Sequence, residues 1–369
     1  MKILILHPWM ALYGGAEVVV VRLAKYLQEH DHTVDIATLS TAGHKDYGGL
    51  NFILPTENAQ MQYRLRDGSV QTLLNIGQMF SRLHKLCAEH ADNYDIINAH
   101  NFPAIWSVPR DAKTVWMCNE IPDPWHSAPT SNLSNQLWNI GRFGDHLIVK
   151  TKQHVKAVVA DVKVAGTFRQ RYGFEPSIIP YGIDGEFLSQ GERHLDSVFH
   201  IICPSMVSPS KNQLGILEAV HFALPKARVT LSGYCEDTHP YVQQIRRYVK
   251  ETGLRVDFVG PTDRESLRSL YHTAHVAVFS GKGQGSWLGP FEQLSVGTPI
   301  IVSPNLTCSS LIKSKNLGIV SNDIAGSLIL VSRLYHEFQQ QALLGQRFVL
   351  QELTWNKFCN RFEEVLRSA

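Results

Sequence analysis

The sequence lacks the long apolar run of a membrane span, which needs about 20 consecutive apolar residues. The opening apolar segment, residues 1–8, is too short for the core of a secretory signal peptide. The six cysteines are scattered, without the paired spacing of a zinc site or a redox dithiol. Lys and Arg number 35 against 33 Asp and Glu, so neither half has the basic excess of a nucleic-acid-binding domain. We therefore expect a cytoplasmic protein with reduced thiols and no nucleic-acid partner.

Several catalytic signatures are absent as well. The sequence has no His-Glu-x-x-His pair, no carboxylate cluster with metal-ligand spacing and no Gly-x-Ser-x-Gly elbow. The pair Gly14-Gly15 lacks the other glycines of the dinucleotide-binding fingerprint. These absences disfavour metal-dependent chemistry, a serine nucleophile and a dehydrogenase, and we expect no metal site.

What the sequence does contain is a repeated alternation of short apolar runs and amphipathic stretches. A chain of 369 residues exceeds what one hydrophobic core usually supports, and the alternation begins again after Asp184. Both halves therefore predict an α/β fold with a doubly wound parallel sheet. The expected strands are Ile3–Leu6, Val34–Leu39, Tyr94–Ala99, Thr114–Met117, His146–Val149, His200–Cys203, Arg228–Ser232, Val256–Val259, Val276–Phe279 and Ile300–Val302. The expected helices are Ala16–Leu27, Ser69–His90, Asn212–Leu224, Tyr241–Glu251 and Trp355–Leu366.

Glycines and isolated charges fall where strands give way to helices, which is where ligands of such sheets bind. Gly14 and Gly15 precede the first helix, whose N-terminus favours an anion. Lys211 follows a strand of the second half and can reach an anion, while Glu292 follows the glycine-rich loop 281–289 and can accept hydrogen bonds from sugar hydroxyls. A tight turn, a solvated lysine and an exposed glutamate are simpler explanations that the sequence alone leaves open.

Two polar pairs follow strands of the first half. His100-Asn101 comes after Tyr94–Ala99, and Asn119-Glu120 comes after Thr114–Met117. We expect both pairs at the carboxyl edge of the first sheet, where a histidine or a carboxylate can serve as acid, base or ligand. Hydrogen-bonded loop residues are an equally good interpretation at this stage.

Several stretches, taken in order, carry a family resemblance that extends over nearly the whole chain. They are Gly14-Gly-Ala-Glu17, Ile179-Pro-Tyr-Gly-Ile-Asp184, Val259-Gly260, Leu270-Tyr271, Pro290-Phe-Glu-Gln-Leu-Ser-Val-Gly-Thr-Pro-Ile-Ile301 and the closing helix that begins at Trp355. The combination resembles the retaining, nucleotide-sugar-dependent glycosyltransferases of family 4. The resemblance implies the GT-B fold, in which two Rossmann-like domains face one another across a cleft. The corresponding domains are an acceptor-binding domain at 1–184, a nucleotide-sugar-binding domain at 185–353 and a terminal helix at 354–369 that crosses back to the first domain.

The resemblance also implies roles for particular residues. Glu292 matches the acid that holds the ribose, Lys211 matches the lysine that clamps the diphosphate, and Gly15 matches the glycine that lets a phosphate approach. The expected donor-binding set is Gly14, Gly15, Lys211, Gly260, Lys282, Gly285, Ser286, Trp287 and Glu292. The expected catalytic set is His100, Asn119, Glu120 and Gln284.

The sequence departs from the family pattern at three informative places. The first acid of the paired-glutamate motif is Gln284, the arginine before the clamp lysine is Met206, and the usual first-domain histidine is Asn119. Losing an arginine removes a charge-assisted phosphate contact of roughly 1.5 to 3 kcal/mol. Our hypothesis is that Lys282 supplies part of the missing charge.

The function that the sequence favours is transfer of a hexose or N-acetylhexosamine from a UDP- or GDP-linked donor to a glycan or lipid-linked acceptor. The resemblance implies that this chemistry needs no cofactor and no metal ion, because in the family the helix N-terminus after the glycine loop offsets the diphosphate charge. The alternative is a weakened subunit that serves as binding partner of an active glycosyltransferase, and a sugar-nucleotide epimerase is disfavoured. Two stretches, Tyr63–Arg66 and Phe168–Tyr172, contain both basic and aromatic residues. They leave open a peripheral contact at the inner face of the membrane, although solvated helix faces explain them more simply.

Overall fold

The computed structural model of the protein describes residues 1–11, 14–41, 47–55, 70–119, 121, 132–281 and 287–369, without the side chains of 70–73 and 132–140. The chain forms two compact units. The first unit comprises Met1–Tyr181 and Trp355–Ala369, and the second comprises Gly182–Thr354.

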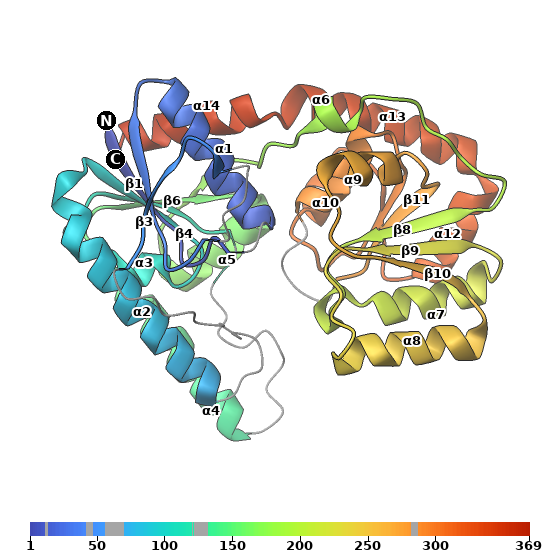
Figure 1. The fold of residues 1–369 in the computed structure, drawn as a ribbon, viewed down its shortest axis with the longest axis horizontal. Helices are drawn as coiled ribbons and strands as arrows, with labels where there is room; N and C mark the ends of the chain where they lie inside the picture. The colour runs from blue at the N-terminus through green and yellow to red at the C-terminus, as the bar shows by residue number, and fades with distance from the viewer. Residues whose placement is uncertain (12–13, 42–46, 56–69, 120, 122–131, 282–286) are drawn as a thin grey trace. The chain divides into compact units, whose positions relative to one another are not determined.

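The first unit is built on a seven-stranded parallel sheet with the order β3-β2-β1-β4-β5-β6-β7 (Figure 1). β1 lies between β2 and β4, so that Ile5 pairs with Ile36 on one side and with Asn98 on the other. The strands are β1 (Lys2–Leu6), β2 (Thr33–Ala37), β3 (Asn51–Ile53), β4 (Ile96–His100), β5 (Thr114–Met117), β6 (Val155–Val159) and β7 (Ser177–Ile178). Because all pairs are parallel, the carboxyl ends of the strands share one edge, and the loops that follow β1, β4 and β5 meet there.

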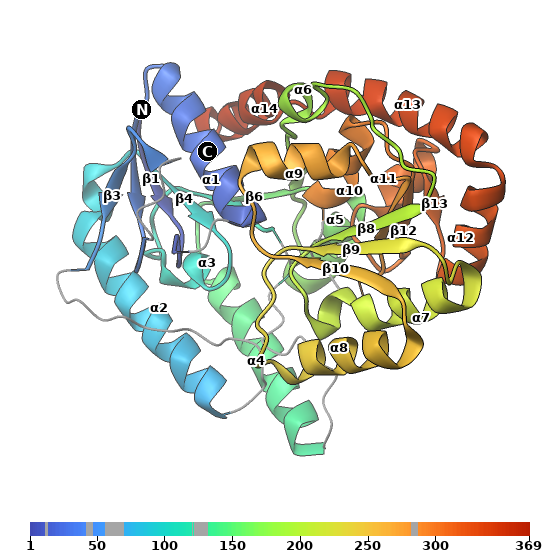
Figure 2. The same cartoon turned by 45° about the vertical axis from the view of Figure 1, so that its right-hand side comes forward.

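Helices cover both faces of this sheet, with α2 and α3 on one face and α1 and α14 on the other (Figures 1 and 2). The helices of the first unit are α1 (Gly15–Glu29), α2 (Val70–His90), the 3-10 helix η2 (Ala91–Asn93), α3 (Ala104–Ser107), α4 (Asn132–Lys150), α5 (Val162–Tyr172) and α14 (Trp355–Arg367). Ile97 and Ala99 of β4 belong to the core on the α2 face. Since side chains alternate along a strand, Asn98 and His100 lie on the opposite face, under α14.

The expected strand at His146–Val149 is wrong, because these residues continue α4 and the next strand is β6. Asp145 and Val149, four residues apart, are both buried, while Leu147 between them is exposed. That spacing belongs to one face of a helix. A run of four apolar residues does not by itself distinguish a strand from a helix.

The terminal helix α14 buries one apolar face, as its apolar spacing predicts, and it belongs to the first unit. Phe358, Phe362 and Leu366 are buried, and α14 contacts α1. The ring of Phe362 stacks on the His100 ring, with 6.2 Å between their centroids. The chain therefore returns to its first unit after completing the second.

The second unit has a six-stranded parallel sheet with the order β10-β9-β8-β11-β12-β13. Its strands are β8 (His200–Pro204), β9 (Arg228–Ser232), β10 (Arg255–Val259), β11 (Val276–Phe279), β12 (Ile300–Val302) and β13 (Ile319–Val320). Its helices are α6 (Gly185–Leu188), the 3-10 helix η3 (Pro209–Lys211), α7 (Gln213–Ala223), α8 (Pro240–Thr252), α9 (Arg264–Tyr271), α10 (Leu288–Ser295), α11 (Ser309–Ser314), α12 (Ile324–Arg333) and α13 (Tyr335–Glu352). α7 and α8 cover one face of the sheet, and α9 and α10 cover the other (Figures 1 and 2).

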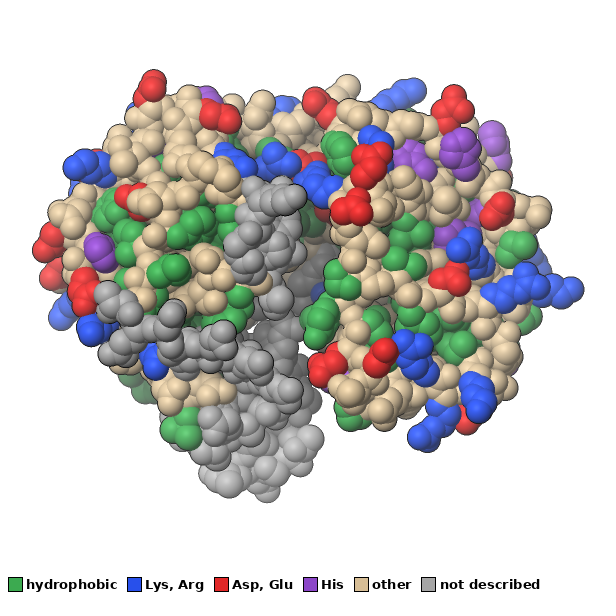
Figure 3. Space-filling model, in the orientation of Figure 1, with side chains coloured by type: hydrophobic (Ala, Val, Ile, Leu, Met, Phe, Trp, Pro, Cys, Tyr) green, Lys and Arg blue, Asp and Glu red, His purple; other side chains and the backbone are tan. Residues whose placement is uncertain are grey.

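The surface of the second unit carries charges of both signs, interspersed on the face that Figure 3 shows. Within the part of the chain that the structure describes, no helix is both long and apolar enough to cross a bilayer. None of the six cysteines, all of which the structure describes, forms a disulfide with another, and five of them are buried.

Candidate functional site

The strand order of the second sheet reverses at β8, which lies between β9 and β11. The helix after β8 is α7 on one face of the sheet, and the helix after β11 is α10 on the other (Figure 2). At such a reversal the two outgoing loops part and leave a crevice at the carboxyl edge, where ligands of doubly wound sheets bind. Lys211 and Glu292 both lie in segments that border this crevice.

Lys211 ends the short helix η3, directly after the carboxyl end of β8, and its side chain is half-buried. The next residue, Asn212, has a left-handed backbone with φ of 56°. Its Nδ2 donates to the Ser280 hydroxyl at 2.9 Å, which ties the β8–α7 loop to the end of β11. A Cβ on Gly215 would lie 2.7 Å from Asn212 Nδ2, so the glycine makes room for this amide. The bridge fixes the loop that carries Lys211.

Glu292 lies on α10 and is held by a neighbouring phenol. The Tyr271 hydroxyl, at the end of α9, donates to Glu292 Oε2 at 3.2 Å. Burial raises the pKa of Glu292, and the hydrogen bond from Tyr271 lowers it. The negative charge of Asp184 raises this pKa further, whereas the positive charge of Arg264 lowers it. Asp184 and Arg264 form an ion pair, with 2.5 Å between Oδ2 and Nη2. The site thus keeps a carboxylate in a place where ionisation is costly, which is typical of functional groups.

Two glycines directly follow strands of the second sheet, at its carboxyl edge. Gly260 follows β10 and is exposed, as expected for a residue that a ligand can approach. Gly233, after β9, has φ of 140°, and a Cβ there would come within 2.7 Å of the Ser205 carbonyl carbon. Only glycine allows this approach to the β8–α7 loop. The sequence analysis missed Gly233, although its place directly after an apolar run was the available signal.

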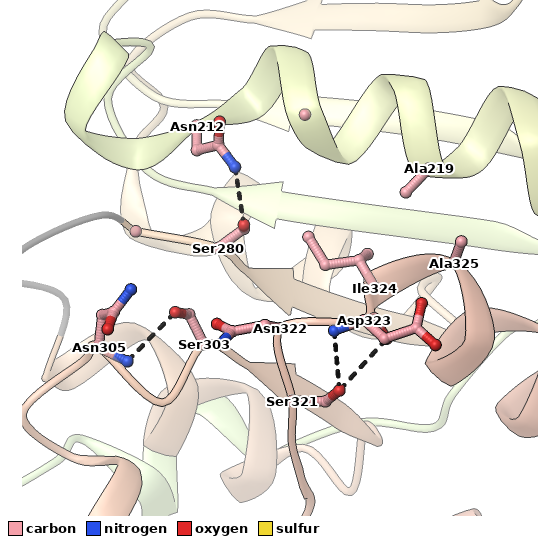
Figure 4. A pocket seen from close by; sticks show the side chains of 12 residues that line it. Asn212, Ala219, Ser280, Ser303, Asn305, Ser321, Asn322, Asp323, Ile324 and Ala325 are labelled. Carbon is pink, nitrogen blue, oxygen red and sulfur yellow. Dashed lines mark hydrogen bonds between the residues drawn. The ribbon is translucent and has the colours of Figure 1, made fainter.

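A cavity of about 410 Å³ opens beside the Asn212–Ser280 bridge. Figure 4 shows hydroxyl and amide groups lining it from the ends of β11, β12 and β13 and from the start of α7. Its lining residues are Asn212, Gly215, Ala219, Ser280, Gly281, Ser303, Asn305, Ser321, Asn322, Asp323, Ile324 and Ala325. Among the described residues, the lining contains one carboxylate and no cationic side chain, so this part of it suits neutral hydroxyl groups better than an anion.

The remaining donor-binding predictions fall partly beyond the described residues. Lys282, Gln284, Gly285 and Ser286 lie outside them, and so the Lys282 hypothesis stays a prediction. Trp287 is described, and its ring is only 5% exposed and lies 4.5 Å from the Phe291 ring. The indole thus anchors the start of α10.

In the first unit, Gly14 and Gly15 open α1, and the carboxylate of Glu17 folds back over them. Glu17 Oε2 accepts from the Gly14 N–H at 2.9 Å, and a Cβ on Gly14 would lie 2.8 Å from this oxygen. Glu17 Oε1 lies 3.8 Å from Nε2 of the buried His7. Burial raises the pKa of Glu17 to about 7 and lowers the pKa of His7 to about 3. His7 is therefore neutral at physiological pH, whereas Glu17 titrates there.

Replacing Glu17 with glutamine is expected to stabilise the protein at pH 8 and to have little effect at pH 5. A carboxyl whose folded pKa is raised loses its stabilising contribution as the pH rises through about 7. The pKa difference corresponds to about 2 kcal/mol between pH 5 and pH 8. Glutamine keeps an oxygen for the Gly14 N–H and removes the titration. Urea unfolding at both pH values measures the effect, and equal changes at the two pH values would contradict it.

The first-unit catalytic candidates separate into buried, accessible and undescribed residues. His100 has no exposed surface, its Nε2 lies 2.8 Å from Asn98 Oδ1, and burial and the neighbouring His7 hold its pKa well below the usual range. We therefore do not retain His100 as a catalytic candidate, since β4 points its ring into the core under α14. Asn119 is half-buried at the end of β5, and its amide bonds Asn101 and Tyr181. Glu120 lies outside the described residues.

No group of three or more His, Cys, Asp or Glu side chains among the described residues could hold a metal ion. The described part of the site contains Lys211, the half-buried Glu292, neutral amides and hydroxyls, and the exposed backbone of Gly260.

Comparison with solved structures defines the class of fold. Anabaena HepE in complex with UDP and glucose is 16% identical, with a TM-score of 0.75 and full coverage of both chains. Sucrose-phosphate synthase from Thermosynechococcus elongatus is 15% identical, with a TM-score of 0.77 over 100% of this chain and 98% of that one. WaaG, a glycosyltransferase involved in lipopolysaccharide biosynthesis, is 14% identical, with a TM-score of 0.70 over 98% and 99%. The fold, two Rossmann-like units, is that of the GT-B glycosyltransferases.

Family comparison makes the assignment more particular. Residues 13–187 match Glycosyltransferase Family 4, and residues 186–325 match Glycosyl transferases group 1. A comparison with curated protein sequences finds no significant match. The chain belongs to the family 4 (group 1) glycosyltransferases and is an enzyme of that class that uses nucleotide sugars.

Proposed function

We propose that the protein is a retaining, metal-independent glycosyltransferase that moves a sugar from a UDP-linked donor to a glycan or lipid-linked acceptor. The observation that carries the proposal is the placement of Lys211 after β8 and of Glu292 on the helix after β11, the two strands between which the order of the second sheet reverses. A lysine suits a diphosphate and a carboxylate suits ribose hydroxyls, so the two groups match the two ends of a nucleoside diphosphate. Gly260 adds exposed backbone after β10 that a nucleoside can approach.

UDP is the donor nucleotide that the comparisons favour. HepE has been solved with UDP and with UDP-glucose, and its fold covers the whole of this chain. The first-unit glycines Gly14 and Gly15 would let a phosphate approach the N-terminus of α1 if the Glu17 carboxylate moved away from the Gly14 N–H. Retention of anomeric configuration and independence of metal follow from the family resemblance. No separate cofactor is required, because the donor itself supplies the activated bond.

The acceptor side of the proposal assigns the first unit to a glycan or lipid-linked molecule. WaaG acts in lipopolysaccharide biosynthesis, which supports an acceptor of this kind. A cytoplasmic location, with peripheral contact at the inner face of the membrane, would bring such an acceptor within reach. An association with a partner glycosyltransferase remains compatible with this arrangement.

The test is a thermal-shift titration with UDP, GDP, ADP and their glucose and N-acetylglucosamine conjugates, with and without EDTA. Ligand at 100 times its Kd adds about 2.7 kcal/mol, which raises Tm by about 5 to 10 °C for a domain of this size. We expect a selective shift with UDP and one UDP-sugar that EDTA does not change. Absence of any shift would contradict nucleotide binding, and loss of the shift in EDTA would contradict metal independence.

Retention is checked separately. With a UDP-sugar that binds, and glucose or a lipid-linked sugar as acceptor, the anomeric proton of the product is followed by NMR. An α-linked donor should give an α-linked product. A β-linked product would show inversion and overturn this part of the proposal.

A further inference from the structure

Three side chains from distant parts of the first unit form a hydrogen-bonded chain at the carboxyl edge of its sheet. Asn101 follows β4, Asn119 follows β5, and Tyr181 is the last residue before the chain enters the second unit. The Tyr181 hydroxyl donates to Asn119 Oδ1 at 2.6 Å. Asn119 Nδ2 in turn donates to Asn101 Oδ1. The Asn101 amide continues the chain to His7, whose Nε2 lies 3.0 Å away.

Tyr181 and Asn101, which lie on either side of Asn119 in this series of hydrogen bonds, are themselves fixed in place. Tyr181 is only 6% exposed, and its ring lies 5.9 Å from the Phe358 ring of α14. Asn101 holds a left-handed backbone with φ of 60°, and its carbonyl accepts from the Ala104 N–H at 3.0 Å. The phenol and the Asn101 amide therefore present their polar atoms to Asn119 at fixed positions.

The two contacts determine which way the Asn119 carboxamide faces. Its oxygen accepts a hydrogen bond from the Tyr181 phenol, and one of its N–H groups donates to Asn101. A 180° flip of the carboxamide would therefore break both bonds. The second N–H has no acceptor among the described residues, and the side chain is half-buried rather than enclosed. Asn119 is thus held as a donor with one N–H left for a ligand oxygen.

We propose that Tyr181 is a positioning residue, which orients the Asn119 amide so that it donates a hydrogen bond to a hydroxyl of the transferred sugar. This inference rests on the proposed function. In this proposal Tyr181 does not contact the substrate, because the Tyr181 hydroxyl already donates its hydrogen bond to Asn119. A neutral amide needs such a device, since without the phenol only the Asn101 contact opposes a flip that would present an acceptor where a donor is required.

The experiment compares wild type, Tyr181→Phe, Asn119→Ala and the double variant in turnover of a UDP-sugar. Loss of one oriented hydrogen bond is expected to lower kcat/KM about tenfold in each single variant. Because Tyr181 acts through Asn119, the double variant should be no slower than Asn119→Ala alone. UDP affinity should stay unchanged in all variants, because UDP lacks the transferred sugar. Tyr94→Phe is the matched control, since the Tyr94 hydroxyl donates to Asp35 Oδ2 at 2.6 Å in the same unit, away from this chain.

Three results would overturn the inference: full activity of Tyr181→Phe, a further tenfold loss in the double variant, or a parallel loss of UDP affinity. A readout that does not depend on turnover is the Asn119 side-chain ¹H–¹⁵N pair, assigned by its absence in Asn119→Ala. It should move with UDP-glucose and not with UDP, and this response should vanish in Tyr181→Phe. If neither UDP nor UDP-glucose binds wild type, the proposed function fails. If both bind and the amide pair does not respond to the sugar, the positioning role fails.

Discussion

Glu292→Ala is expected to weaken UDP binding about 100-fold and to abolish the preference for UDP over 2′-deoxy-UDP. The proposed role of Glu292 is to accept hydrogen bonds from ribose hydroxyls. Bonds to a charged acceptor are worth about 1.5 to 3 kcal/mol each, and 1.4 kcal/mol is a tenfold change in affinity. Isothermal titration of both nucleotides against wild type and variant measures the effect. Equal losses for the two nucleotides would contradict ribose binding by Glu292.

The stability of the unliganded variant supplies the control. Burial raises the pKa of Glu292, so the native state bears a cost for keeping this group ionised at neutral pH. Glu292→Ala should therefore leave Tm unchanged or raise it, even though nucleotide binding is lost. Tyr271→Phe removes the donor that favours the ionised carboxyl. The pKa of Glu292 should therefore be higher in Tyr271→Phe than in wild type. As the pH is lowered, the variant should lose UDP affinity at a higher pH than wild type does.

Lys211→Ala is expected to remove the preference for UDP over UMP, with a loss of UDP affinity of about 100-fold. The lysine is proposed to pair with the diphosphate, and truncating one partner of such a pair costs about 2 to 5 kcal/mol. The affinity for UMP should fall less than the affinity for UDP, because UMP has a single phosphate in place of the diphosphate that the lysine is proposed to contact. The UDP affinity of wild type should also fall with rising ionic strength more steeply than that of the variant.

Lys226→Ala is the matched control for charge. Lys226 is an exposed lysine of the same unit that precedes β9, so it lies near the amino edge of the sheet, away from the crevice. Removing it should change neither the ratio of UDP to UMP affinity nor the salt dependence. Unchanged nucleotide binding in Lys211→Ala would instead contradict the diphosphate role of that lysine and point to other cations, of which Lys282 is the candidate named from the sequence.

Much of the fold could be predicted because its signals are local. The strands at Thr114–Met117, Arg228–Ser232, Val276–Phe279 and Ile300–Val302 have the bounds expected from short apolar runs between turn residues. The strand expected at His146–Val149 failed because a helix with one buried face gives the same local run. Local composition does not decide between the two when the partner surface is unknown.

The candidate site was predictable only as a set of positions. Lys211 was predicted at the carboxyl edge because it follows a strand, and Glu292 was predicted as a ligand group because it follows the glycine-rich loop 281–289. Nothing in the sequence identified the groups that hold them. The Tyr271 hydroxyl on Glu292, the Asn212–Ser280 bridge and the close approach at Gly233 all join segments separated along the chain.

The sequence by itself determined the alternation of strands and helices, the two sheets and the kinds of residue at their carboxyl edges, because these follow from the period of apolar residues along the chain. Only the tertiary structure decided which edge residues face outward and what charge they carry. His100 is buried because β4 turns it under α14, while Asn119, after the adjacent strand, stays accessible. Glu17 titrates near neutrality because it is desolvated beside His7. Desolvation and side-chain contact depend on neighbours distant in sequence, and so only the packed fold fixes them.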